Sequence, residues 1–130
     1  MAGLHATNKD LVVWQKAIAL ALCIYRSSER FPRNELFGLT SQLRRAAVSI
    51  PSNIAEGAAR RTTREFLMFL HVARGSLAEV ETQILLARQL GYLDERQRAD
   101  LEMLVIEVGR LINSFIVGLR RRRESAPTNR

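Results

Sequence analysis

Apolar residues recur at alternating steps of four and three along residues 66–87 of this chain. The series consists of Phe66, Leu70, Ala73, Leu77, Val80, Ile84 and Ala87. This spacing follows one face of an α-helix and continues for about three heptads, so it predicts a helix that packs against others along its length. Thr62 and Glu65 precede the series as a capping box, and Gly91 is expected to end the helix.

Three further segments show helical spacing of their apolar residues. We predict helices over about residues 9–30, 34–57, 63–91 and 95–120, joined by short turns. Short turns make consecutive helices antiparallel, so the predicted fold class is all-α, an antiparallel up-down-up-down four-helix bundle.

The ends of the predicted elements carry their own signals. Asn34 is the expected N-cap of the second helix, and Asp94 with Gln97 forms the expected capping pair of the fourth. Residues 1–8 are predicted to be a disordered leader and residues 121–130 a disordered basic tail, because neither has an apolar face.

Two positions interrupt the helical pattern. Pro51 removes a backbone donor inside the second helix, but the apolar stripe continues in phase beyond it, so we predict one helix kinked at Pro51 that ends near Gly57. Gly75 lies in the middle of the third helix, where glycine costs about 1 kcal/mol relative to alanine. Close approach of another helix is the expected compensation.

The first helix is apolar nearly all round, which predicts a second contact with another subunit.

Arginine dominates the basic residues, which number 20 against 13 acidic ones and give a net charge of +7. Up-down topology brings the turn after the second helix and the end of the fourth to one end of the bundle. A basic cluster at one end is typical of polyanion binding. We therefore predict nucleic-acid-binding residues at Arg44, Arg45, Arg60, Arg61, Arg64, Arg120, Arg121, Arg122 and Arg123.

A structural explanation of the same charges stays open. The last four of these arginines also complement the negative end of a helix dipole and keep the tail soluble. The aromatic residues Trp14, Tyr25, Phe66 and Phe115 are expected on core stripes, so we predict contacts to the phosphate backbone rather than stacking on single strands.

Motifs of enzymes are missing from the chain. His5 and His71 are the histidines, Cys23 is the single cysteine, and no spacing of metal ligands, phosphate loop or nucleophile elbow occurs. We expect a non-enzymatic protein with no cofactor and no metal. Residues 1–10 lack the basic-then-apolar layout of a signal peptide, and no apolar run is long enough to cross a bilayer, so a cytoplasmic location is expected.

Residues 49–57 (SIPSNIAEG) and 75–82 (GSLAEVET) carry a resemblance to a known family. The chain resembles the four-helix-bundle proteins encoded in 23S rRNA intervening sequences over about residues 10–118. That family is similar to the accessory variability determinant protein of diversity-generating retroelements, a homopentameric barrel that binds nucleic acid and partners a reverse transcriptase. The resemblance implies a homopentamer. The motif residues expected to be structural or to form a subunit contact are Ser49, Pro51, Ser52, Asn53, Glu56, Gly57 and Gly75.

Two functions follow as alternatives. The first is an oligomeric nucleic-acid-binding protein that contacts RNA or DNA mainly through arginine and phosphate. The second is a scaffold or accessory subunit for another protein, such as a reverse transcriptase or an RNA-processing factor.

Overall fold

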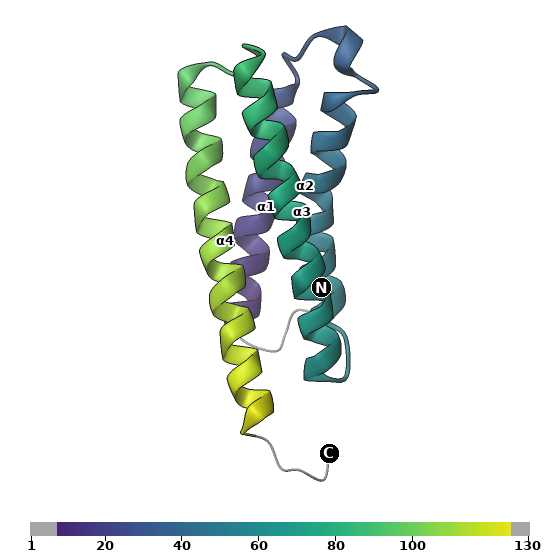
Figure 1. The fold of residues 1–130 in the computed structure, drawn as a ribbon, viewed down its shortest axis with the longest axis vertical. Coiled ribbons are helices and arrows are strands. Elements are labelled where there is room, and N and C mark those ends of the chain that lie inside the picture. The colour runs from purple at the N-terminus through teal and green to yellow at the C-terminus, as the bar shows by residue number, and fades with distance from the viewer. Residues whose placement is uncertain (1–7, 126–130) are drawn as a thin grey trace.

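The computed structural model describes the backbone of residues 8–125 and the side chains from residue 12 to residue 125. It contains four α-helices and a short 3₁₀-helix, η1: α1 (Asn8–Ser28), η1 (Arg33–Glu35), α2 (Leu39–Ala58), α3 (Thr63–Gln89) and α4 (Glu95–Glu124). The described residues contain no strand, which confirms the predicted all-α class (Figure 1). The leader predicted over residues 1–8 falls outside the described residues except for Asn8, which begins α1.

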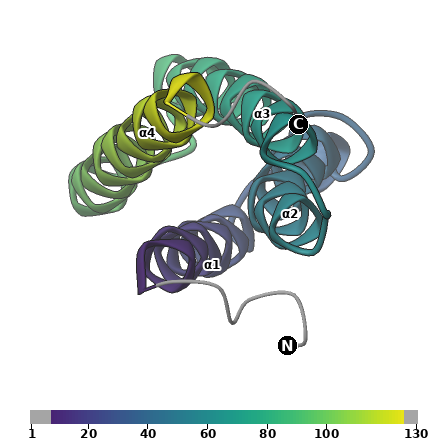
Figure 2. The ribbon, with the colours of Figure 1, turned by 90° about the horizontal axis from the view of Figure 1, so that it is seen from below.

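Each helix packs against its two neighbours in the bundle. The contacting pairs are α1 with α2, α2 with α3, α3 with α4, and α4 with α1. Seen along the bundle, the helices follow one another in chain order (Figure 2). Consecutive helices run in opposite directions, so the α2–α3 turn lies at the same end of the bundle as the C-terminus of α4 (Figure 1). The predicted four-helix bundle is confirmed.

All four helices contribute side chains to one hydrophobic core. The heptad positions of α3 from Leu70 to Ala87 are buried, as the spacing predicted. Phe66, at the start of the same series, is half-buried and packs edge-to-face against Phe115 of α4, with ring centroids 5.1 Å apart. Each fully buried aliphatic side chain contributes about 1.5–3 kcal/mol to folding, so this core holds the helices in register.

The predicted start of the second helix at Asn34 is wrong. Residues Arg33–Glu35 form η1 instead, and α2 begins at Leu39. Glu35 explains the difference: one carboxylate oxygen accepts from the amide of Leu39 at 3.2 Å, and the other accepts from the hydroxyl of Tyr92 at 2.9 Å. The first bond satisfies a free amide of the α2 N-terminus, and the second ties this segment to the α3–α4 turn.

We expect Glu35→Ala to lower the free energy of unfolding by about 1–2 kcal/mol, because both hydrogen bonds are lost. Urea denaturation measures the change. Glu29→Ala is the matched control: Glu29 is exposed at the same end, and its loss should change stability by less than about 0.5 kcal/mol. Equal losses in the two variants would contradict the capping role of Glu35. The hydrogen bond between Tyr92 and Glu35 raises the pKa of the Tyr92 phenol. Ultraviolet titration of this phenol in the native protein and in the Glu35→Ala variant therefore gives a second readout.

Helix α2 is continuous through Pro51, whose side chain is buried. Downstream, the Asn53 amide donates to the carbonyl of Ser49 at 2.8 Å and to its hydroxyl at 3.0 Å. The hydroxyl of Ser49 also shares a 2.7 Å hydrogen bond with that of Ser76 on α3. Polar residues of the predicted motif therefore link α2 to α3, which agrees with a structural role. Ser52 is exposed and contributes no such bond among the described residues.

The two glycines singled out by the sequence differ in their surroundings. Helix α2 ends at Ala58, one residue after Gly57, as predicted. A Cβ at Gly57 would lie 2.8 Å from the Phe66 ring and 2.8 Å from Cβ of Phe69, so Gly57 permits close packing of α2 against the start of α3. Gly75 is exposed, and nothing lies within 4 Å of a Cβ placed there. The close approach predicted for Gly75 is wrong within this chain; it occurs at Gly57.

Helix caps were predicted more successfully than the tail. Asp94 and Gln97 form the complete capping box of α4. The Thr62 hydroxyl accepts from the amide of Glu65 at 3.1 Å, although the Glu65 carboxylate does not accept from the Thr62 amide in return. The prediction of a disordered tail from residue 121 is wrong up to Glu124, because α4 extends through that residue. Residues 126–130 lie outside the described part of the chain.

Candidate nucleic-acid interface

The α2–α3 turn and the first turn of α3 together present three arginines at one end of the bundle. Arg60, Arg61 and Arg64 are all exposed. Arg60 is partly engaged, because it pairs with Glu56 at 3.2 Å and its guanidinium lies 4.8 Å from the centre of the Phe69 ring. Arg61 and Arg64 form no ion pair among the described residues.

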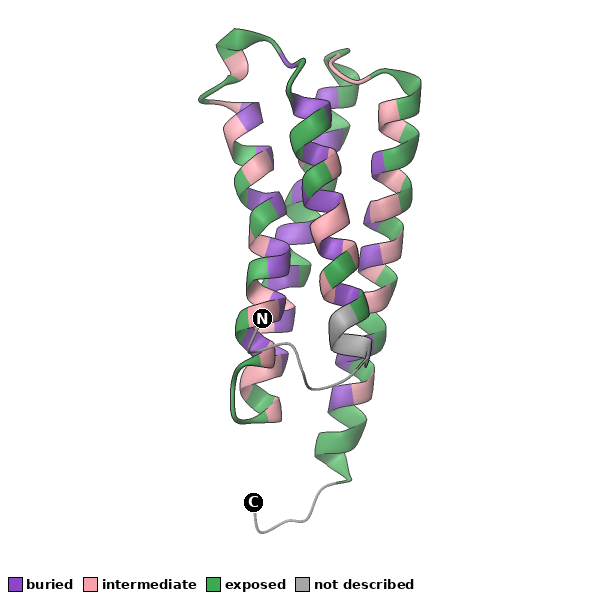
Figure 3. Cartoon of the chain, turned by 180° about the vertical axis from the view of Figure 1, so that it is seen from behind, coloured by how far each residue is buried: buried purple, intermediate pink, exposed green. Residues whose placement is uncertain are grey.

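The last turn of α4 brings four consecutive arginines to this same end. Arg120 to Arg123 are exposed and helical (Figure 3). Because consecutive helical residues point in different directions, these side chains surround the end of α4 rather than forming one stripe. We call the set Arg60, Arg61, Arg64, Arg120, Arg121, Arg122 and Arg123 the arginine end.

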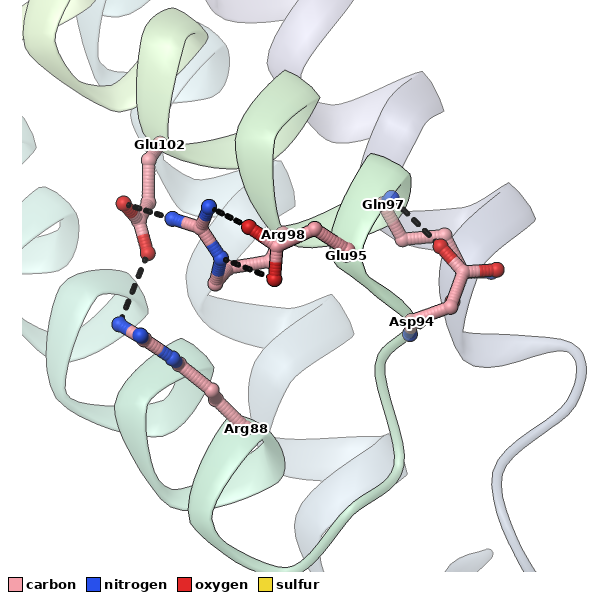
Figure 4. A network of polar contacts seen from close by, with 6 residues as sticks. All are labelled: Arg88, Asp94, Glu95, Gln97, Arg98 and Glu102. Carbon is pink, nitrogen blue, oxygen red and sulfur yellow. Dashed lines mark hydrogen bonds and ion pairs between the residues drawn. The ribbon is translucent and has the colours of Figure 1, made fainter.

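The opposite end of the bundle differs in how its charges are paired. Arg98 of α4 contacts both Glu95 and Glu102, and Arg88 of α3 reaches Glu102 at 3.5 Å (Figure 4). The contact with Arg98 lowers the pKa of Glu95, and both carboxylates raise the pKa of Arg98. Arg88 and Arg98 at that end therefore have carboxylate partners, whereas Arg30, Arg33 and Arg96 there form no ion pair among the described residues. At the arginine end, the ion pair found among the described residues joins Arg60 to Glu56.

Two residues of the predicted interface lie elsewhere. Arg44 donates to the Ser28 hydroxyl at 2.8 Å and to the carbonyl of Tyr25 at 3.3 Å, so it helps to cap the C-terminus of α1. Its guanidinium also lies 4.7 Å from the centre of the Tyr25 ring. Tyr25 itself is 40% exposed, so the prediction that it lies on a core stripe is wrong. Arg45 is exposed on α2 beside Ser49, away from the α2–α3 turn. The structure does not bring Arg44 or Arg45 to the arginine end.

One cationic group was missed by the sequence analysis. His71 and Arg74 of α3 face Arg120 of α4, and Arg74 also donates to the Asn113 side chain at 3.2 Å. The spacing of three residues between His71 and Arg74 was visible in the sequence. Their juxtaposition with Arg120 was not, because it depends on how α3 and α4 pack.

The described part of the chain shows no cluster of three or more histidine, cysteine, aspartate or glutamate residues arranged to hold a metal ion. Cys23 is a half-buried free thiol whose pKa is raised mainly by that burial, so it is poorly activated as a nucleophile. Within residues 8–125, no helix is both long and apolar enough to cross a membrane.

Comparisons with known proteins agree with the observed fold. The model of the 23S rRNA-intervening sequence protein family matches residues 9–114. The chain is also similar to a solved structure of a protein of unknown function from the S23 ribosomal protein family of Bacteroides thetaiotaomicron VPI-5482. The TM-score is 0.76 at 25% sequence identity, and the match covers 83% of this chain and 97% of that chain. No significant match to a curated protein is found. Because the family match spans most of the bundle, from α1 into α4, this chain belongs to the 23S rRNA-intervening sequence protein family.

Proposed function

We propose that this protein is a non-enzymatic, oligomeric nucleic-acid-binding protein that contacts the phosphate backbone through its arginine end. The observation that carries the proposal is the gathering of seven exposed arginines from two distant segments at one end of the bundle. Among the described residues, the carboxylate that pairs with one of them is Glu56. Guanidinium groups bind phosphate in two-point contacts, so such a cluster attracts a polyanion.

The aromatic residues favour backbone contacts over stacking on bases. Phe115 is buried, and Trp14 and Phe66 pack partly buried against the core. Tyr25 lies under Arg44 near the C-terminus of α1, far from the arginine end. Single-strand binders use exposed aromatic platforms, so duplex or structured RNA, or duplex DNA, is the better ligand class for this surface.

An oligomer is the second part of the proposal. Val12 and Leu22 of α1 are 42% and 48% exposed, which leaves apolar surface outside the core of a single chain. We propose that this surface is covered in a homopentameric barrel, with α2 bent at Pro51, as the resemblance to the retroelement accessory protein implies. Such a ring would place five arginine ends together and raise the local charge. Light scattering measures the subunit number, and a monomer at micromolar concentration would contradict this part.

Binding of short RNA and DNA duplexes to filters tests the main proposal. Affinity should fall steeply between about 50 and 200 mM salt, because each phosphate contact releases counterions. Retention of neither duplex at the lower salt concentration would end the proposal. A cytoplasmic location, which we also propose, would give the protein access to such ligands.

An accessory or scaffold function is the second candidate, favoured by a different surface. Leu36 and Phe37 lie between η1 and α2 and are 51% and 93% exposed among the described residues. A reverse transcriptase or an RNA-processing factor is the proposed kind of partner. Pull-down from nuclease-treated cells should then recover a protein with the native chain and lose it with Phe37→Ser. Equal recovery by both would contradict this assignment.

A further inference from the structure

The His71 side chain of α3 lies between two arginines, Arg74 of α3 and Arg120 of α4. Arg74 approaches Nδ1 of His71 at 3.0 Å, and Arg120 approaches Nε2 at 3.1 Å. His71 is half-buried, while both arginines are exposed, so the group opens to solvent. Of the titratable side chains facing His71, Arg74 comes from its own helix and Arg120 from α4.

This arrangement has more hydrogen-bond donors than acceptors. A neutral imidazole offers one accepting nitrogen, and guanidinium groups only donate, so one of the two contacts cannot be a hydrogen bond. In the protonated form, neither can. Partial burial and the two neighbouring arginines accordingly lower the pKa of His71. The group lacks an acceptor that could satisfy all three side chains together.

Acceptors within the protein do not fill this gap. Asn113 accepts one hydrogen bond from Arg74 through its side-chain oxygen, at 3.2 Å. No carboxylate pairs with Arg74 or Arg120 among the described residues. By contrast, Arg98 at the other end of the bundle contacts two carboxylates, Glu95 and Glu102. Arg64 lies two turns before His71 on α3, so the group continues into the arginine end.

We propose that His71, Arg74 and Arg120 form a binding site for a phosphate group of the nucleic-acid backbone. A tetrahedral oxyanion carries several acceptor oxygens and one negative charge, so it can accept from both guanidinium groups and from the imidazolium at once. This inference rests on the proposed function and adds a specific position to it, where the ligand contacts α3 and α4 together.

Nuclear magnetic resonance of His71 tests the site directly. The His5→Ala variant leaves a single histidine in the chain, so its ring signals need no further assignment. In the free protein, the pKa of His71 should lie below the ordinary value of about 6.5, and with a saturating RNA duplex it should rise to that value or above it. Sulfate serves as the inorganic probe because its charge is constant over this pH range. Chloride at equal ionic strength is its control.

The three additions, RNA duplex, sulfate and chloride, distinguish the possible results. A rise in the pKa of His71 with RNA and with sulfate, but not with chloride, supports the site. A rise in this pKa with sulfate but not with bound RNA would identify a site for a small free oxyanion. It would overturn the assignment to a phosphate of the nucleic-acid backbone. An unchanged pKa of His71 in a complex that binds RNA tightly would overturn the site and leave the proposed function standing.

Affinity gives an independent readout. Arg74→Gln with Arg120→Gln should weaken RNA binding at least about fivefold and reduce the slope of log affinity against log salt by about one. The matched control is Arg30→Gln with Arg96→Gln, which removes the same charge from exposed positions at the opposite end. Equal weakening by the two double variants would contradict the site.

The affinity of the native protein for the RNA duplex should rise from pH 8 to pH 6, because bound phosphate favours the imidazolium of His71. The His71→Gln variant should lose that rise.

Discussion

Gly57→Ala is expected to lower the free energy of unfolding by about 1–3 kcal/mol, even though alanine is the better helix former. The added methyl group would meet the Phe66 ring and Cβ of Phe69, each at 2.8 Å. Cβ of Phe69 moves only with the α3 backbone, so the α2–α3 contact has to open. That contact is the most extensive in the bundle.

Gly75→Ala is the matched control for this substitution and should have the opposite sign. Gly75 lies inside α3, with nothing within 4 Å of the added carbon, so the variant should gain up to about 1 kcal/mol. Urea denaturation of both variants, with light scattering at the same protein concentration, measures stability and assembly together. Destabilisation by Gly75→Ala, or stabilisation by Gly57→Ala, would contradict the packing described here.

The second large effect concerns the arginine end. Replacing Arg121, Arg122 and Arg123 with glutamine should weaken binding of an RNA duplex by roughly tenfold or more at about 100 mM salt. The slope of log affinity against log salt should fall by up to about 2.7, because each lost phosphate contact removes about 0.9. These side chains are exposed, so the fold should persist, and circular dichroism checks this.

The control for this triple variant removes the same charge from the opposite end. Arg30, Arg33 and Arg96 are exposed there and form no ion pair among the described residues. Their replacement with glutamine should leave the slope nearly unchanged. If the two triple variants lose affinity equally, net charge and not the arginine end controls binding.

The sequence predicted those features that depend on local spacing. The heptads of α3, the capping box at Asp94 and the antiparallel order of the helices follow from residues close together in the chain. The start of α2 was missed because Glu35 acts together with Tyr92, which lies 57 residues away. No pattern near Asn34 reports that contact.

The candidate site divides in the same way. Up-down topology was enough to bring the α2–α3 turn and the end of α4 together, since chain direction alone decides it. The charge of Arg44 is visible in the sequence and predicts a place in the interface. Its hydrogen bond to Ser28 on α1, which holds it elsewhere, cannot be read from the sequence. No residue near His71 in the sequence could complete a metal site with it, so the sequence predicts no role for His71. Its contact with Arg120 depends on how α3 and α4 pack together. Gly57 and Gly75 likewise differ in their tertiary neighbours, not in their local sequence.

Chemical modification of arginine, read by mass spectrometry with and without a bound RNA duplex, tests the central claim most directly. Reactivity at Arg61, Arg64 and Arg121 should fall sharply in the complex, while Arg30, Arg33 and Arg96 should react as they do in the free protein. Protection of Arg30, Arg33 and Arg96, with continued reactivity of Arg61, Arg64 and Arg121, would show that the bundle binds nucleic acid with its opposite end and would contradict binding at the arginine end.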